Sequence, residues 1–276
     1  MKHLINIFKQ YKYELLLIYT YMLIAEGLLL LQPYFLGKTI DGLLVGNWNW
    51  LIGLVLVYAG STMFIYKRMV YDTKVYTKIY NNIVMEFIHK TDVDNSSKVA
   101  RTDMAHQIVD VLESYVHYYI SVIVTVLGSL VFVMRGSLIT GFIVLGCVFP
   151  IMFIVFKFYK KIKQATVVGN NQYEKKVDVI NRSNKDEITS FFNRRRKLWI
   201  YGSTLQGKNW FWVNAVKYTF LVTALIVFIK TSDKLSQGDI IAMYSYISNF
   251  LVSLMSIPVG VEAYSRILDV LKRIQC

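Results

Sequence analysis

The amino-acid sequence predicts an all-α membrane protein with six transmembrane helices, and two observations carry this prediction. Hydrophobic residues make up 55% of the 276 residues, and the mean hydropathy is +0.40, higher than in soluble domains. Six apolar segments are also long enough to cross a bilayer, which takes about 20 residues at helical rise. These segments are residues 14–36, 48–66, 116–134, 137–156, 210–229 and 240–259.

Positive charge is distributed unevenly along the chain. Of the 31 Lys and Arg residues, 26 lie in the two termini and in the long segments that follow the second and fourth spans, and Lys217 lies in the first turns of the fifth apolar segment. The other four are Lys38, Arg135, Lys230 and Lys234. Cytoplasmic loops carry the excess of Lys and Arg, so the pattern predicts a multi-pass protein of the plasma (inner) membrane with both termini cytoplasmic. Topology thereby accounts for the net charge of +13, and we expect no nucleic-acid partner.

The two long segments, 67–115 and 157–209, are predicted to continue the membrane helices into the cytoplasm. In the first, apolar residues recur every three or four positions, which predicts one face packed on a neighbouring helix. They are Val75, Ile79, Ile83, Phe87 and Ile88. Residues 1–13 predict an amphipathic elbow helix lying on membrane lipid. The first apolar run is too long for a signal peptide, so we interpret residues 1–276 as one six-helix domain. The connection after the first span is expected to take about a dozen residues.

Residues 202–209 come close to a phosphate-binding loop. They read Gly-Ser-Thr-Leu-Gln-Gly-Lys-Asn, with Asn209 at the position where such a loop needs the hydroxyl of Ser or Thr to hold magnesium. A membrane span follows instead of a soluble helix, so we interpret the match as coincidence and Gly202 and Gly207 as loop or helix-weakening residues. The four histidines show no metal-binding spacing, and an intramembrane enzyme therefore has little support.

Three short motifs add to this plan of long inner and short outer connections. Segment 32–43 contains Pro33, Gly37 and Asp41; segment 97–101 is followed by Asp110; and segment 237–240 leads through Pro258 to residues 266–268. Together they resemble the transmembrane domain of an ABC exporter, the type with long cytoplasmic helix extensions and two coupling loops. The chain departs from that family in having Ser96 and Ser97 where a glycine is common. It also ends at Cys276, where a fused ATPase domain would begin.

The resemblance implies a permease subunit that pairs with a second six-span domain as a homodimer or heterodimer. ATP and magnesium would bind a separate ATPase subunit, and this chain would carry no cofactor, metal or catalytic residue of its own. Alternating access would move an unknown small or amphipathic substrate. The alternative is a motorless relative that acts as a channel, a proton-linked carrier or a scaffold.

Two regions are candidates for coupling to the ATPase. The resemblance places the first coupling region at Ser96, Ser97 and Arg101 and the second at residues 186–193. In the second, Phe191 and Phe192, next to the further candidate Asn193, would enter a groove on the partner, because bulky buried side chains transmit a rotation without slipping. The three arginines that follow would rim that groove or neutralise anionic lipid.

Candidates for the translocation pathway are polar residues inside the spans. Glu26 is the only acid deep in a span, and it is either linked to substrate or protons or held by a hydrogen bond from another helix. Two further helix faces either line a cavity or join helices through small residues and hydrogen bonds. They comprise Tyr58 and Thr62 in the second span and Ser245, Asn249 and Ser253 in the sixth.

Overall fold

The computed structural model describes residues 9–90, 106, 109, 113, 116–174, 176–181, 185–232 and 234–275. Within these ranges the side chains of residues 86–90, 163, 165–167, 169–174, 176–178 and 257–275 are not described. The helices are α2 (Lys12–Leu44), α3 (Asn49–Lys90), α5 (Val116–Gly136), α6 (Leu138–Gly146), α7 (Val148–Glu174), α8 (Lys176–Asn181), α9 (Lys185–Thr231) and α10 (Gln237–Gln275). The predicted elbow, residues 1–13, lies mostly outside the described residues.

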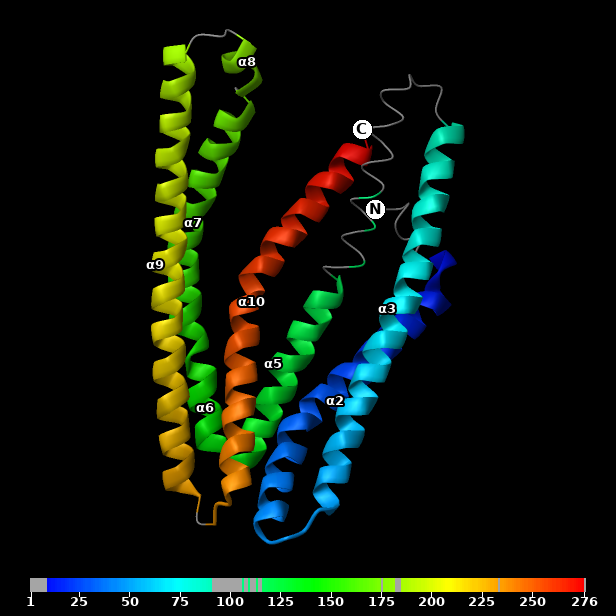
Figure 1. Ribbon diagram of the computed structural model, residues 1–276, viewed down its shortest axis with the longest axis vertical. Helices are drawn as coiled ribbons and strands as arrows, with labels where there is room; N and C mark the ends of the chain where they lie inside the picture. Colours follow the sequence, from blue (N-terminus) through cyan, green and yellow to red (C-terminus); the bar gives the residue numbers. More distant parts are fainter. Residues whose placement is uncertain are drawn as a thin grey trace. The chain divides into compact units, whose positions relative to one another are not determined.

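The helices form two compact units. Unit 1 comprises Met1–Gly141 and Val227–Cys276, and unit 2 comprises Phe142–Ile226. In unit 1, α2 packs against α3, α5 and α10, and α5 also packs against α10. In unit 2, α7 and α9 run in opposite directions (Figure 1).

A tight turn joins α2 to α3, and the sequence explains its geometry. Gly46 has a φ of 75°, the left-handed conformation that ends many helices. The N–H of Asn47 donates to the carbonyl of Gly42 at 2.8 Å, and that of Gly46 donates to Leu43 at 3.1 Å, the two bonds of a Schellman motif. Helix α2 therefore continues to Leu44, and the expectation of a dozen-residue connection was wrong because this motif stops the helix abruptly.

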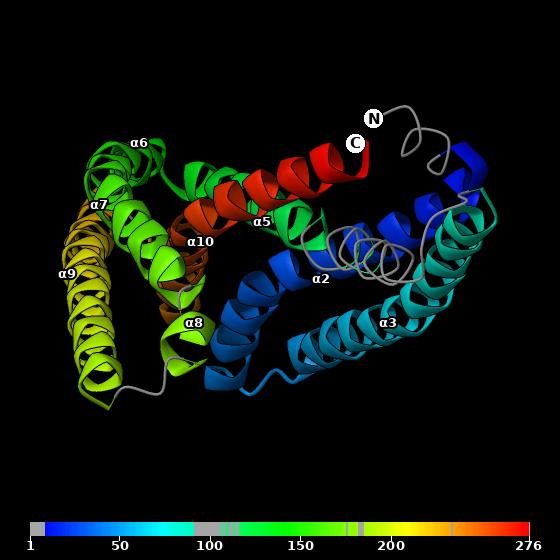
Figure 2. The ribbon, with the colours of Figure 1, turned by 90° about the horizontal axis from the view of Figure 1, so that it is seen from above.

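Two prolines shape the membrane helices. Pro33 lies buried inside α2, and Figures 1 and 2 both show α2 changing direction along its length. A proline inside a helix lacks the N–H for the carbonyl four residues earlier and clashes with it, which bends the helix. Pro150 has the same effect on the carbonyl of Gly146, where α6 ends before α7 begins at Val148. The predicted fourth span is thus two helices divided at Cys147.

The extension of α3 beyond the second predicted span has one buried face, as the apolar stripe predicted. Val75, Ile79 and Ile83 are 5% or less exposed and form a core with Tyr11 and Ile18 near the start of α2. Full burial of such a side chain stabilises a fold by about 1.5–3 kcal/mol. The predictions for Phe87 and Ile88 lie outside the described side chains.

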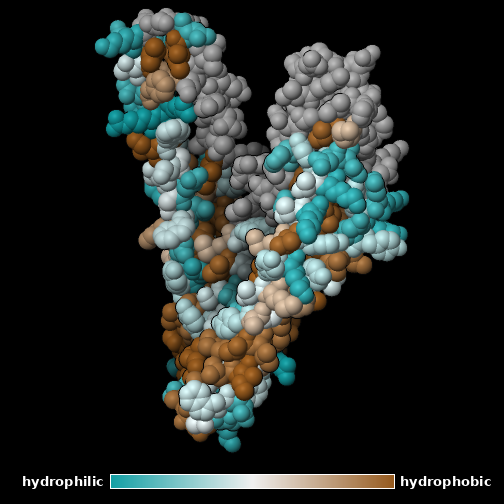
Figure 3. All heavy atoms as spheres, turned by 45° about the vertical axis from the view of Figure 1, so that its right-hand side comes forward, coloured by the Kyte–Doolittle hydropathy of each residue, from teal (hydrophilic) through white to brown (hydrophobic). Residues whose placement is uncertain are grey.

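Surface hydropathy separates the two parts of α3. On the face that Figure 3 shows, brown apolar side chains gather toward the turn that joins α2 and α3, and teal side chains cover the extension. The exposed side chains Ile52, Val55 and Leu56 lie in the first part, whereas Lys74 and Lys78 lie in the second. Exposed apolar side chains at the predicted spans suit contact with lipid.

Five described helices are long and apolar enough to cross a membrane. They are Lys12–Leu44, Asn49–Met85, Val116–Gly136, Leu138–Ile162 and Lys185–Thr231. Each contains one of the first five predicted spans. The sixth prediction, residues 240–259, lies within α10, whose described side chains end at residue 256.

Candidate functional site

The near match to a phosphate-binding loop lies inside a continuous helix. Residues 202–209 belong to α9, and a Cβ added to Gly202 or Gly207 would meet nothing within 4 Å. A phosphate-binding loop needs successive backbone N–H groups turned outward, and in a helix interior those groups are bonded to carbonyls. This segment is therefore ordinary helix. The reading of the two glycines as loop residues was wrong, and the alternative of helix-weakening residues remains.

The candidate residues of the second coupling region lie in the first turns of α9. Phe191 is 9% exposed and Phe192 is 41% exposed, and their rings meet edge to face with centroids 5.4 Å apart. Asn193 is exposed next to them. In the structure this region begins the 47-residue α9 and is not a separate short helix. Any motion imposed on Phe192 is therefore transmitted along α9 through unbroken helix.

The arginine run follows on the same helix. Arg195 lies over the ring of Trp199, 4.8 Å from its centroid, and Trp199 is exposed. An exposed pair of this kind contributes about 0.5–1 kcal/mol and suits the boundary between water and lipid headgroups. The first coupling candidates, Ser96, Ser97 and Arg101, lie outside the described residues.

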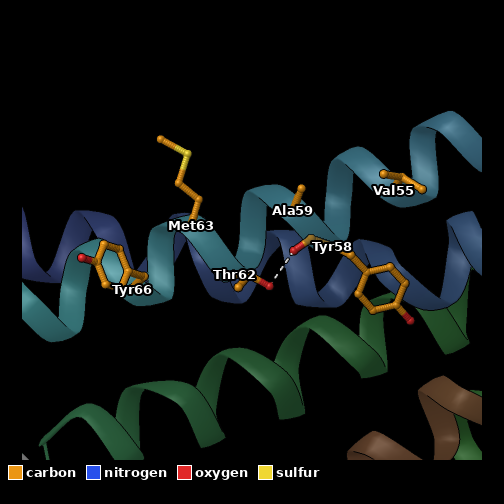
Figure 4. A pocket seen from close by; sticks show the side chains of 6 residues that line it. All are labelled: Val55, Tyr58, Ala59, Thr62, Met63 and Tyr66. Atoms are coloured by element: carbon orange, nitrogen blue, oxygen red, sulfur yellow. Dashed lines mark hydrogen bonds between the residues drawn. The ribbon is translucent and has the colours of Figure 1, made fainter.

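The polar candidates of the second span lie on an open face of α3. Tyr58 and Thr62 line a hollow of about 590 Å³ with Val55, Ala59, Met63 and Tyr66, all from the same helix. Figure 4 shows the Thr62 hydroxyl bonded to the Tyr58 carbonyl, an O–H donor to its own helix at 2.9 Å. The hydroxyl donates within its own helix, and Thr62 forms no hydrogen bond to another helix among the residues that the structure describes.

The sixth-span candidates are half-buried along α10. The Ser245 hydroxyl donates to the carbonyl of Ile241 at 2.8 Å, again within its own helix. Asn249 and Ser253 lie further along α10 with intermediate exposure. Glu26 is half-buried on α2, and it forms no hydrogen bond or ion pair with any residue that the structure describes. These residues stay candidates for the pathway.

The polar contacts that do join helices were not predicted, and the largest set joins α2 to α10. We call it the α2–α10 clasp, formed by Gly37, Lys38, Asp41, Ser236, Gly238 and Asp239. Its centre is a glycine pair: a Cβ added to Gly37 would lie 2.5 Å from the carbonyl oxygen of Gly238, and one added to Gly238 would lie closer still to that of Gly37. The two backbones touch because neither residue has a side chain.

Carboxylates complete the clasp. Asp41 accepts a hydrogen bond from the Ser236 hydroxyl at 2.6 Å and another from the N–H of Gly238 at 2.8 Å. Asp239 and Ser236 form a capping box, in which the Asp239 N–H donates to Ser236 Oγ at 3.0 Å and the Ser236 N–H donates to Asp239 Oδ2 at 3.3 Å. The N–H groups of Gly238 and Asp239, two of those left free at the start of α10, are thereby satisfied.

An ion pair lies beside the cap. Lys38 Nζ is 3.3 Å from Asp239 Oδ1. Burial alone would raise the pKa of Asp239, but the hydrogen bonds from Ser236 and the Lys38 ammonium outweigh burial and hold the pKa below its usual value. The clasp therefore contains a carboxylate that is stabilised in its charged form.

A second unpredicted cluster joins α3 to α5. Asp72 is 5% exposed, and its Oδ2 atom lies 3.7 Å from Arg68 Nε and 3.9 Å from His117 Nε2. The rings of Tyr19 and Tyr76 lie 6.0 and 6.3 Å from the His117 ring. Buried charges are costly unless they are paired, so this cluster ties together the helices that supply it. Arg68 and Asp72 are four residues apart, a helical spacing that signals such a pair.

No metal site emerges from the described part of the chain, where no three His, Cys, Asp or Glu residues come together. His106, one of the histidines described, lies edge to face with Tyr80, their ring centroids 5.7 Å apart. The main polar features of the described residues are thus the α2–α10 clasp and the buried charge cluster of Arg68, Asp72 and His117, both of which join packed helices.

Comparison with known proteins identifies the fold. The family described as ABC transporter transmembrane region matches residues 4–238. A search of curated proteins found no match to the chain. The family match covers most of the chain and confirms the resemblance drawn from the short motifs.

Proposed function

This chain belongs to the family of ABC transporter transmembrane regions, and from that premise we propose that it is the permease subunit of an ABC-type transport system. ATP and magnesium bind and react on a separate ATPase subunit. The permease pairs with a second six-span domain and exposes a small or amphipathic substrate to each side of the membrane in turn. It carries out no chemistry itself.

The side chains in the first turns of α9 support coupling to the ATPase at this site. Phe192 presents an exposed aromatic side chain, Asn193 lies beside it, and Phe191 is buried with its ring against that of Phe192. Aromatic side chains of this kind are the usual anchors of protein interfaces. Since α9 runs unbroken from Lys185 to Thr231, a push on its first turns moves the membrane-spanning part of the same helix.

The charge distribution supports the orientation. With 26 of 31 basic residues in the termini and the two extensions, the extensions and both termini face the cytoplasm of a plasma (inner) membrane protein. The start of α9 is then on the side where ATP is available.

The test is co-purification of ATPase activity with the full chain in mild detergent. We expect Phe192→Asp to reduce the co-purifying activity at least tenfold. The aspartate loses the packing of the ring in the partner's groove and buries a carboxylate there without a partner. Tyr201→Ala is the matched control, because Tyr201 is a similarly exposed aromatic residue on the same helix, at 53%. Equal activity in the Phe192→Asp sample and the wild type would contradict docking at this site.

Glu26 favours a second candidate function, a proton-linked carrier. A half-buried carboxylate in a span without a described partner suits a group that binds and releases protons. Under this alternative, Glu26→Gln abolishes the dependence of transport on a pH gradient and no ATPase co-purifies. If the chain is a permease, transport by the Glu26→Gln variant still depends on ATP.

A further inference from the structure

A cavity of about 550 Å³ lies in unit 1 at the end that carries the connections 45–48, 137 and 232–236. Its walls come from α2, α5, α10 and the segment that joins α9 to α10. Cavities of this size suit a small organic ligand. The cavity is separate from the hollow on α3 and contains none of the predicted pathway residues.

Most of the wall is apolar. Leu31, Phe132, Phe228 and Met243 line it, together with Tyr246. The rings of Phe132 and Tyr246 stack with centroids 4.6 Å apart and planes 3° from parallel. The Tyr246 hydroxyl donates to the carbonyl of Leu30 at 2.9 Å, so its polar atom is already satisfied. The wall therefore offers an ordered apolar surface to a ligand.

Three cations also line the cavity, and two of them form no ion pair with a carboxylate that the structure describes. Lys38 is paired with Asp239, the one lining carboxylate. Arg135 and Lys234 are exposed, and no carboxylate in the described ranges forms an ion pair with either. The nearby Asp41 is occupied by the Ser236 hydroxyl and the Gly238 N–H. Asp233, which precedes Lys234 in the sequence, lies outside the described residues.

The basic residues that lie outside the termini and extensions are concentrated around this cavity. Five of the 31 basic residues lie outside the termini and extensions, and three of these five line this cavity. The other two, Lys217 and Lys230, lie on α9 and are not among the lining residues. A lysine or arginine that only keeps a helix end in water does not need to lie beside an apolar cavity wall.

We propose that this cavity binds an amphipathic anion, whose carboxylate or phosphate lies between Arg135 and Lys234 and whose apolar chain lies along Phe132, Phe228 and Met243. Arginine and lysine bind such groups through charge-assisted hydrogen bonds. The ligand comes either from the membrane, as an anionic lipid, or from water, as a soluble amphiphile. The inference requires neither the ATPase subunit nor a particular orientation of the chain, so it goes beyond the proposed function.

The test measures binding of the fluorescent fatty acid cis-parinaric acid to the full chain in an uncharged detergent, with its methyl ester as the neutral probe. We expect the acid to bind at least tenfold more tightly than the ester. Arg135→Gln and Lys234→Gln should each weaken binding of the acid about tenfold, the effect of losing one charge-assisted hydrogen bond. Neither variant should change binding of the ester.

Two further variants serve as controls. Arg135→Lys keeps the charge and should retain binding of the acid within about threefold. Lys230→Gln removes a lysine near the end of α9 that does not line the cavity, and it should leave binding unchanged. Each variant is compared with the wild type by its thermal unfolding, so that lost binding is not confused with lost folding. Equal affinity for acid and ester, or equal losses in Lys230→Gln and Lys234→Gln, overturns the proposal.

Competition identifies the source of the ligand. Displacement of the acid by phosphatidylglycerol, but by neither phosphatidylcholine nor hexyl phosphate, assigns a membrane lipid. Displacement by hexyl phosphate alone assigns a soluble amphiphile. If phosphatidylcholine competes as well as phosphatidylglycerol, charge is not recognised and the proposal fails. Because ATPase co-purification is measured separately, failure here leaves the proposed permease function unaffected.

Discussion

Gly238→Ala should separate α2 from α10 and destabilise unit 1. The added methyl group would overlap the carbonyl oxygen of Gly37 and would lie 2.5 Å from its carbonyl carbon and 2.7 Å from Asp41 Oδ2. Side-chain carbons essentially never approach backbone so closely, so the helices must move apart. Overpacking of this kind costs about 1–3 kcal/mol. Loss of the bond from the Gly238 N–H to Asp41 adds about 1 kcal/mol, the worth of a helix cap.

The assay is thermal unfolding of the purified chain in detergent. A total loss of about 2–4 kcal/mol corresponds to a fall in Tm of roughly 4–16 °C for a chain of this size. Gly27→Ala is the matched control, because Gly27 lies in α2 and a Cβ there would meet nothing within 4 Å. Alanine is the better helix former by about 0.5–1 kcal/mol, so that variant should melt at or above the wild-type Tm.

Two results would refute this reasoning. In the first, Gly238→Ala melts within about 2 °C of the wild type, which would mean that the helices are not in backbone contact. In the second, Gly27→Ala loses as much stability as Gly238→Ala, which would mean that any side chain on these helices is disruptive. Gly37→Ala provides an independent check from the opposite helix, since its Cβ would lie 2.5 Å from the Gly238 carbonyl oxygen.

Three further predictions concern single side chains. Asp72→Asn should lower the Tm by leaving Arg68 unpaired, at a cost of about 2–3 kcal/mol, and the double variant with Arg68→Gln should recover most of the loss in the same melting assay. The pKa of Asp239 is lowered by folding, so its charged form stabilises the protein above the usual pKa of 3.8 and that contribution is lost as the pH falls through the lowered value. The Tm difference between wild type and Asp239→Asn should thus be present at pH 7 and vanish at low pH. Lys208→Ala should leave binding of a fluorescent ATP analogue unchanged, because Lys208 lies in the interior of α9, and a loss of binding would restore the phosphate-loop reading.

Local periodicity in the sequence predicted the helices and their buried face. Apolar residues at helical spacing identified Val75, Ile79 and Ile83, and these side chains are buried in the structure. The information lies within a few turns of one helix, so no knowledge of other helices is needed. Local sequence also rejected the phosphate-binding loop, since Asn209 stands where Ser or Thr is needed and a membrane span follows instead of a soluble helix.

Contacts between distant segments could not be predicted in this way. The motif with Gly37 and Asp41 and the motif with Gly238 were each recognised as family features, but nothing in either motif states that the two touch. A carboxylate that caps another helix looks in the sequence like any polar residue in a turn. Likewise, the spacing of Arg68 and Asp72 predicts a pair on one helix but does not reveal that His117 of α5 lies against it.

The clasp restricts where unit 1 can move. Ser236 and Asp41 are 195 residues apart, and Lys38 and Asp239 are 201 apart, so these bonds join the first and last described helices of the chain. At this end α2 is also held to α3 by a Schellman turn, and α10 is capped by the same carboxylates. Separating the helices here requires breaking an ion pair and two capping interactions at once. Rearrangement within unit 1 during transport should therefore begin at the other end, where the extension of α3 lies, while the clasp acts as a hinge. A clasp variant such as Gly238→Ala would then alter transport more than it alters binding of the ATPase.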